Sequence, residues 1–204
     1  MGDETTMKNL TVRAENGVKT LSRIAFIVGG WLLILLSLMV CAEVVLRKVF
    51  NHSLQGVDEY GGYALAITSA IGFAYAFYEG AHIRIDVLIR RLPRSLRIVS
   101  SVIAHLSLLF VAGLFAKYTA LLAIESWELG AFANTPLRTP LYIPQAVWAG
   151  GMFLFLVALA VRLAVILEGL VRRQWPDLVA LLDPRAEDVA EIERVLHDIE
   201  GHGQ

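Results

Sequence analysis

Cysteine is nearly missing from this chain of 204 residues, where Cys41 is the only one. A single cysteine excludes a disulfide within the chain. Because the histidines are also few and scattered, zinc and iron–sulfur centres are unsupported. Charged residues are scarce, at 18%, and no nucleophile–base arrangement or phosphate-binding loop is apparent. These absences argue against an enzyme with its own active site and against a soluble globular domain.

Long apolar stretches dominate what is present. Hydrophobic residues make up 56% of the chain, and the mean hydropathy is +0.60. A helix needs about 20 mostly apolar residues to cross the hydrocarbon of a bilayer. The sequence therefore predicts an all-α membrane protein with four transmembrane helices. The four stretches are Ile24–Leu46, Tyr60–Phe77, Arg97–Ile124 and Pro144–Leu167.

The first stretch follows several basic residues, as a signal peptide would, but it is longer than the apolar region of such a peptide. We interpret it as an uncleaved first span. The predicted division of the chain is then an N-terminal segment 1–23, a four-span membrane domain 24–173 and a tail 174–204. In the tail, Asp183 followed by Pro184 is typical of a helix start, and a narrow apolar seam after it predicts a short amphipathic helix.

The segment near residues 83–92, between the second and third stretches, is too short and too charged to span a bilayer. As a helix, it has apolar side chains at i, i+3, i+4 and i+7, with its basic side chains off that stripe. This pattern predicts an in-plane amphipathic helix against lipid headgroups or a partner subunit. The residues of this predicted interface are Arg84, Ile85, Leu88, Ile89, Arg90, Arg91 and Leu92.

The distribution of lysine and arginine predicts the orientation of the chain. Basic residues cluster before the first stretch, in the second connection and directly after the fourth stretch. The first connection holds Arg47 and Lys48, and the third holds only Arg138. Because cytoplasmic loops carry the excess of positive charge, both termini and the second connection are predicted to be cytoplasmic.

Ionisable residues inside the apolar stretches are candidates for a functional role. Glu43 and Lys117 each lie about 20 residues from the cytoplasmic end of their stretch, or roughly 30 Å along a helix. A shared depth predicts an interhelical ion pair. The alternative is that Glu43 pairs with Arg47, four residues on, while Lys117 extends its ammonium toward the membrane surface. His105 is expected to bond to neighbours such as Ser101, because haem ligation by two histidines would need a second one in the membrane.

The second stretch carries small residues at every fourth position, a spacing that allows close contact between membrane helices. These residues are Gly62, Ala66 and Ala70, and again Gly72, Ala76 and Gly80. We therefore expect this stretch to be the most tightly packed. Asp58 and Glu59 precede it, where the N-terminus of a helix favours negative charge. Helix capping and contact with another subunit are both open explanations for this acidic pair.

The segment Gly80–Pro93, GAHIRIDVLIRRLP, follows this acidic pair and a second stretch rich in small and aromatic residues. It resembles the H-I-R-x-D and leucine–proline pattern of one family, the small membrane subunits of tripartite ATP-independent periplasmic (TRAP) transporters, also called DctQ-like or Q-type. The resemblance covers about Ile24 to Arg173. The positions that match the family motif are Asp58, Glu59, His82, Arg84, Asp86 and Pro93.

This resemblance implies a scaffold subunit of a heteromeric symporter in the bacterial inner membrane. A large membrane subunit would bind sodium and the substrate, and a periplasmic binding protein would deliver an organic acid. The small subunit would then hold no catalytic residue, cofactor or metal of its own, and sodium would bind in the partner subunit. Two other interpretations stay open, a membrane anchor of a redox enzyme and a stand-alone membrane assembly protein. In every case membrane lipids are partners and nucleic acid is not.

Overall fold

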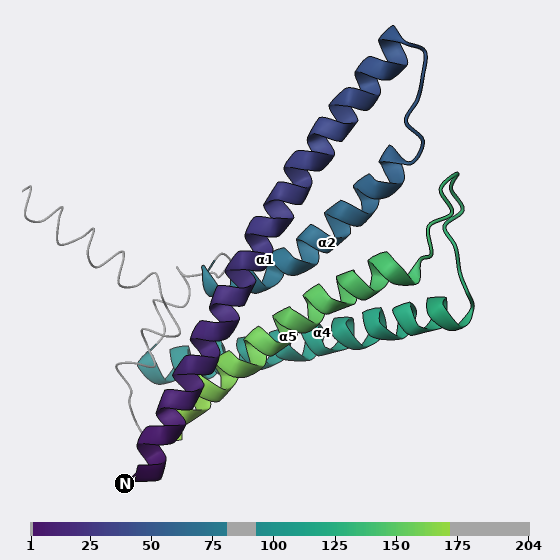
Figure 1. Cartoon of the computed structure of the whole chain (residues 1–204). Coiled ribbons are helices and arrows are strands. Elements are labelled where there is room, and N and C mark those ends of the chain that lie inside the picture. Colours follow the sequence, from purple (N-terminus) through teal and green to yellow (C-terminus); the bar gives the residue numbers. More distant parts are fainter. Residues whose placement is uncertain (1, 81–92, 172–204) are drawn as a thin grey trace, which may run out of the picture.

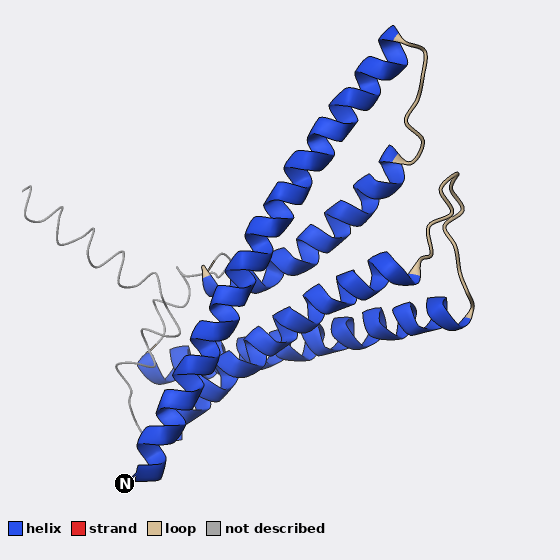
Figure 2. Ribbon diagram, in the orientation of Figure 1, coloured by secondary structure: helices blue, strands red, loops and turns tan. Residues whose placement is uncertain are grey.

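The computed structural model describes residues 2–80 and 93–171. The described residues form four α-helices and, besides them, one isolated bridge between Phe132 and Pro140. The prediction of an all-helical fold is therefore confirmed (Figures 1 and 2). The helices are α1 (Gly2–Val49), α2 (Val57–Tyr78), α4 (Arg94–Glu128) and α5 (Tyr142–Val171).

Each helix is longer than the apolar stretch that predicted it, because charged residues at the ends continue the helix. Arg47 and Lys48 form the last turn of α1, where basic side chains interact favourably with the helix dipole. The chain turns after this helix, and α2 begins after Gly56, whose φ of 93° lies in the left-handed region. Glycine adopts this conformation without the steric cost that other residues meet.

Within the described ranges, three segments are long and apolar enough to cross a membrane: Arg13–Val49, Val99–Glu128 and Tyr142–Leu170. They lie in α1, α4 and α5. α2 is not among them, since its glycines, tyrosines and hydroxyl residues make it less apolar. The four-span arrangement therefore stays a prediction. The in-plane helix near 83–92 and the helix of the tail lie outside the described residues.

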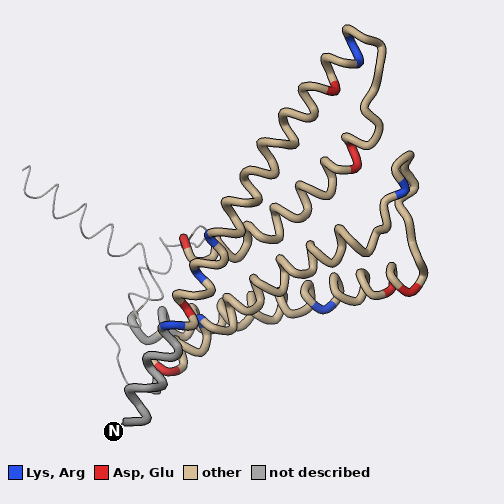
Figure 3. The backbone as a smooth tube through the Cα atoms, viewed as in Figure 1, with Lys and Arg blue, Asp and Glu red and all other residues tan. Residues whose placement is uncertain are grey.

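The helices pack as two hairpins, α1 with α2 and α4 with α5. Contacts between α2 and α5 join the hairpins, and α1 also touches α5. In Figure 1 the hairpins meet at the end where α1 begins and diverge toward their connecting loops. Figure 3 shows charged residues mostly at the helix ends and loops, which leaves the middle of the bundle largely uncharged.

The core lies where α2, α4 and α5 meet, and small side chains dominate it. Alanines on all three helices let the backbones approach closely, which is how membrane helices gain packing energy without a hydrophobic driving force. Phe26 of α1 stacks on Tyr75 of α2, with ring centroids 4.4 Å apart, and extends the packing to the first hairpin. The buried core residues are Ala70, Ala74, Phe77, Tyr78, Ala112, Ala116, Met152, Phe155, Ala158 and Leu159.

The tightest contact in the core joins α2 to α5. A Cβ atom placed on Gly151 would lie 2.9 Å from the Cβ of Ala70 and 3.1 Å from the backbone nitrogen of Ile71. The small residues of the second stretch thus supply a close helix contact through Ala70. Gly62 and Ala66 are exposed and make no such contact within the chain, whereas Gly72, Ala76 and Gly80 are half-buried.

Replacing Gly151 with alanine should destabilise the bundle, because the added methyl group meets backbone atoms of α2 that cannot move independently of the helix. Overpacking of this kind costs about 1–3 kcal/mol. The neighbouring Gly150 is the matched control, since it is exposed and a Cβ atom added there would have nothing within 4 Å. Gly150→Ala should be neutral or slightly stabilising, because alanine favours the helix by up to about 1 kcal/mol. Titration of the purified protein with SDS measures both, and equal stabilities would contradict the close contact.

Candidate functional site at the two ends of the helix bundle

Glu59, at the start of α2, is the centre of a polar cluster at the loop end of the bundle. It is buried, and its carboxylate accepts hydrogen bonds from the hydroxyl groups of Tyr63 (2.9 Å) and Thr135. Thr139 also bonds to this carboxylate, through its side chain and its backbone. We call Glu59, Tyr63, Thr135 and Thr139 the loop-end cluster. It ties the first turns of α2 to the connection between α4 and α5.

The connection that Glu59 holds is itself folded into a small hairpin. The backbone N–H of Ala133 donates to the carbonyl of Thr139 (2.9 Å), and that of Leu141 donates to the carbonyl of Ala131 (3.0 Å). A Cβ atom on Gly56, just before α2, would collide with the side chain of Leu137 at the hairpin tip. The tip therefore lies directly against the start of α2.

Donated hydrogen bonds set the charge state of Glu59. The bond from Thr135 is the largest cause, followed by bonds from Thr139, and together they hold the pKa of Glu59 below its ordinary value although burial opposes them. Hydrogen bonds to a carboxylate favour its ionised form. Glu59 lies outside the stretch Tyr60–Phe77, at the edge of the apolar region. The cluster thus contains a stable carboxylate whose hydrogen-bond donors all come from this chain.

Asp58 and Glu59 face different sides of α2. Asp58 is exposed, whereas Glu59 is buried. Successive residues of an α-helix are rotated by about 100°, since 3.6 of them complete a turn. The two members of the acidic pair therefore have different roles: one carboxylate anchors a loop of the same chain, and the other faces outward.

Glu43 forms a second tie at the loop end, between α1 and the loop that follows it. It accepts a hydrogen bond from the hydroxyl of Ser53 (2.7 Å) and another from the backbone N–H of Leu54 (2.5 Å). Glu43 is buried despite its position near the end of α1. The loop between α1 and α2 is therefore folded back onto the helix that precedes it.

The structure does not bring Glu43 and Lys117 together, so the predicted interhelical ion pair is absent. Glu43 is bonded within the first connection, while Lys117 is exposed on α4 with its ammonium 5.7 Å from the ring centroid of Tyr118. α1 packs on α2 and α5, whereas α4 packs on α5. Equal depth along two helices is not sufficient for contact, because the two side chains must also face one another.

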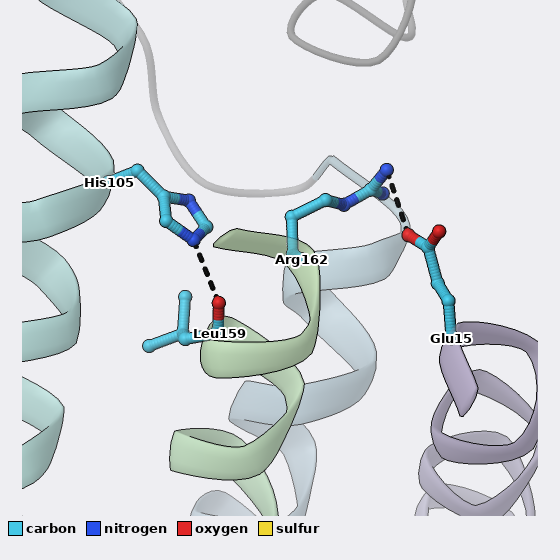
Figure 4. Close-up of polar contacts among 4 residues, drawn as sticks. All are labelled: Glu15, His105, Leu159 and Arg162. Carbon is cyan, nitrogen blue, oxygen red and sulfur yellow. Dashed lines mark hydrogen bonds and ion pairs between the residues drawn. The ribbon is translucent and has the colours of Figure 1, made fainter. Parts of the chain in front are cut away.

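The opposite end of the bundle has a polar cluster that the sequence analysis missed. Arg162 of α5 forms an ion pair with Glu15 of α1, with 3.0 Å between Nη1 and Oε1 (Figure 4). The guanidinium also lies 5.7 Å from the ring centroid of Tyr78 and 6.0 Å from that of Phe77. These distances permit cation–π attraction. One arginine thus joins three helices, and its position as the only charge between Pro144 and Leu167 was a signal for it.

His105 lies beside this cluster and contacts α5. It is buried, and its Nε2 donates a hydrogen bond to the carbonyl of Leu159 at 3.0 Å (Figure 4). Its ring centroid is 5.6 Å from that of Phe77. The sequence predicted a bond to a neighbour such as Ser101 on the same helix, but the observed bond crosses to another helix. His105, Glu15 and Arg162 together form what we call the Arg162 cluster.

Of the other motif positions, three lie outside the described residues and one, Pro93, lies within them. His82, Arg84 and Asp86, together with the rest of the predicted in-plane interface, lie outside the described residues. Pro93 directly precedes α4, with φ −58° and ψ 150°. Proline suits this position because its fixed φ and missing N–H are compatible with the start of a helix.

A family model for the DctQ component of tripartite ATP-independent periplasmic transporters matches residues 36–169. This range covers most of the chain, from the second half of α1 almost to the end of α5. The chain belongs to this family. The match confirms the resemblance drawn from the motif around Gly80–Pro93. Comparison with curated proteins and with solved structures gives no match.

Membership of the DctQ family, together with the three long apolar helices, identifies a multi-pass membrane protein that is the small component of a TRAP transporter. The family is one of transporter components and not of enzymes. Among residues 2–80 and 93–171, no group of three acidic, histidine or cysteine side chains could hold a metal ion. The polar side chains of both clusters bond to one another or to the backbone, and they hold helices and loops in place.

Replacing Glu59 with glutamine should lower the melting temperature of this DctQ-family protein, because an amide holds hydroxyl donors less strongly than a carboxylate does. The matched control is Asp58→Asn, which removes the same charge one residue earlier from an exposed side chain and should change little. Thermal unfolding in detergent measures both variants.

Acid should bring the stability of the wild type closer to that of Glu59→Gln. The folded-state pKa of Glu59 is lowered, so its stabilising effect is complete above the ordinary pKa and is lost as pH falls through the folded value. Wild-type stability should consequently drop below the ordinary glutamate pKa by more than that of Glu59→Gln. Parallel pH profiles would contradict a structural role for this carboxylate.

Proposed function

We propose that this chain is a scaffold for the large membrane subunit of a sodium-coupled TRAP transporter that takes up an organic acid. The proposal rests on the bonding partners of the buried and half-buried polar side chains. Glu43, Glu59, His105 and Arg162 bond to this chain's own loops and helices. Polar groups that hold helices together suit a rigid support, whereas a substrate site needs polar groups that converge on a shared space.

Family membership supports the proposed partners. The family is a component of tripartite transporters, and in our proposal the other two components are a large membrane subunit and a periplasmic binding protein. In our proposal the large subunit binds sodium and the organic acid and carries them across by an elevator motion. Such a motion needs a second body that stays fixed in the membrane. Two hairpins tied at both ends would supply one.

We propose that α2 crosses the membrane as well, so that the chain has four spans. The stretch Tyr60–Phe77 of α2 has 18 residues, about 27 Å at 1.5 Å per residue, which is close to a hydrocarbon core of roughly 30 Å. It packs between α1 and α5, both of which can span a membrane. Burial against these neighbours compensates for its glycines and tyrosines, which reduce its affinity for lipid.

The proposed orientation places both termini and the second connection on the cytoplasmic face of the inner membrane. The in-plane helix near 83–92 would then lie at that face, with its basic residues against anionic headgroups or the large subunit. Each basic residue near such a surface contributes about 1 kcal/mol of attraction. This helix would hold the scaffold at a set depth.

Cysteine labelling tests whether α2 crosses. In a Cys41→Ser background, Asn51→Cys and Glu79→Cys place single thiols at exposed positions on either side of α2. A membrane-impermeant maleimide added to spheroplasts should label Asn51→Cys directly, and it should label Glu79→Cys only after permeabilisation. Labelling of both from the same side would show that α2 does not cross.

Transport by reconstituted complexes tests the scaffold role. Omitting this chain should abolish sodium-driven uptake, while binding of the substrate to the isolated periplasmic protein stays unchanged. Glu43→Gln and His105→Leu should lower complex stability or the maximal rate, because they loosen the support without touching the substrate. Uptake of several organic acids should keep its order of preference in both variants. A switch of preferred substrate would mean that this subunit lines the translocation path.

A further inference from the structure

Lys117 stands on the face of α4 that is turned away from α5. The buried residues Ala112, Ala116 and Thr119 mark the opposite face of the helix. Around Lys117 the exposed face is apolar along its length, with side chains three or four residues apart. These exposed residues are Phe110, Leu114, Leu121 and Ile124. The result is a hydrophobic strip with a single cation in its middle.

The position of Lys117 along α4 makes this cation costly. It lies 11 residues before Glu128 and 18 after Val99, the ends of the apolar segment, which is about 16 Å and 27 Å at 1.5 Å per residue. The Cα–Cβ bond of a helical residue tilts toward the helix N-terminus. For Lys117 that direction leads toward the more distant end, so the side chain starts away from the nearer membrane surface. The ring of Tyr118, 5.7 Å away, compensates for the charge only in part.

No carboxylate in the described parts of the chain serves as the counter-ion of Lys117. The positions three and four residues away on α4 hold Gly113, Leu114, Ala120 and Leu121, which are all uncharged. Three carboxylates of the other helices have partners of their own: Glu43 binds Ser53, Glu59 binds Thr135, and Glu15 binds Arg162. A charge inside a membrane normally pairs with an opposite charge or faces a polar cavity. This pattern indicates that the counter-ion of Lys117 belongs to another molecule.

We propose that the face of α4 centred on Lys117 is the docking surface for a transmembrane helix of the large subunit that carries an aspartate or glutamate at the same depth. This inference rests on the proposed function, because it takes the large subunit as the occupant. The ammonium would meet the carboxylate across the interface, and the apolar residues on either side would exclude water from the pair.

The geometry of the strip supports a helix as the occupant. Exposed residues at 110, 114, 117, 121 and 124 repeat at alternating intervals of four and three. This spacing aligns side chains along the contact of two helices that cross at about 20°. A buried charge pair in such a seam fixes the register of the two helices. Lys117 would thereby set the height at which the scaffold meets the moving subunit.

Removal of the charge tests the pair. Lys117→Met keeps the length and the apolar stem of the side chain, so the large subunit would be left with an unpaired carboxylate. Co-purification of the large subunit should fall by about tenfold or more, the scale expected for a polar contact between membrane helices. Lys117→Arg should restore it. Arg138→Gln, which removes a charge from the exposed loop, is the matched control and should assemble normally.

Two further measurements, of melting temperature and of self-association, complete the co-purification test. The melting temperature of the isolated chain should be the same for wild type and Lys117→Met, which excludes a folding defect. If wild type itself fails to co-purify with the large subunit, the proposed function is wrong. If wild type co-purifies and Lys117→Met does so equally, the docking surface is wrong and lipid headgroups solvate the ammonium. A loss of self-association by Lys117→Met without the large subunit would assign the surface to a second copy instead, and would also overturn the inference.

Discussion

The contact between Ala70 and Gly151 is the constraint on which the arrangement of the bundle depends. It lies where α2 meets α5, and these two helices join the α1–α2 hairpin to the α4–α5 hairpin. The backbones approach so closely only because one position has no side chain and the other has a single methyl group. Larger residues at either position would push the hairpins apart. The side chains of the two polar clusters would then lose their hydrogen-bond and ion-pair partners on the other hairpin.

The two ends of the bundle use different chemistry for the same purpose. At the loop end, Glu59 collects neutral hydroxyl donors and stays ionised at the edge of the apolar region. At the other end, Arg162 combines an ion pair to Glu15 with the faces of aromatic rings. Both arrangements satisfy a charge that the hydrocarbon cannot solvate. Glu59 joins α2 to the connection between α4 and α5, and Arg162 joins three helices. The interactions that satisfy these charges therefore also hold the fold together.

Hydropathy alone predicted that the fold is helical and approximately where the helices lie, because a span is a property of about 20 consecutive residues. Hydropathy could not predict the direction in which a side chain points around the helix axis, because this direction changes by about 100° per residue. For this reason Glu43 and Lys117, although both lie within long helices, do not meet. For the same reason the adjacent Asp58 and Glu59 could not be told apart. Arg162 was visible in the sequence, but its partner Glu15 lies outside the apolar stretch and no spacing rule connects them.

The hairpin between α4 and α5 has a consequence for how members of this family can diverge. Its tip reaches Gly56 and its two threonines hold Glu59, so the number of residues in the loop determines whether these contacts can form. Surface loops usually tolerate insertions, but a longer or shorter tip here would take away the threonine donors of a buried carboxylate and leave it only Tyr63. Among members of the family, insertions and deletions should therefore occur mainly in the other connections. This loop should keep the same number of residues even where its exposed residues differ.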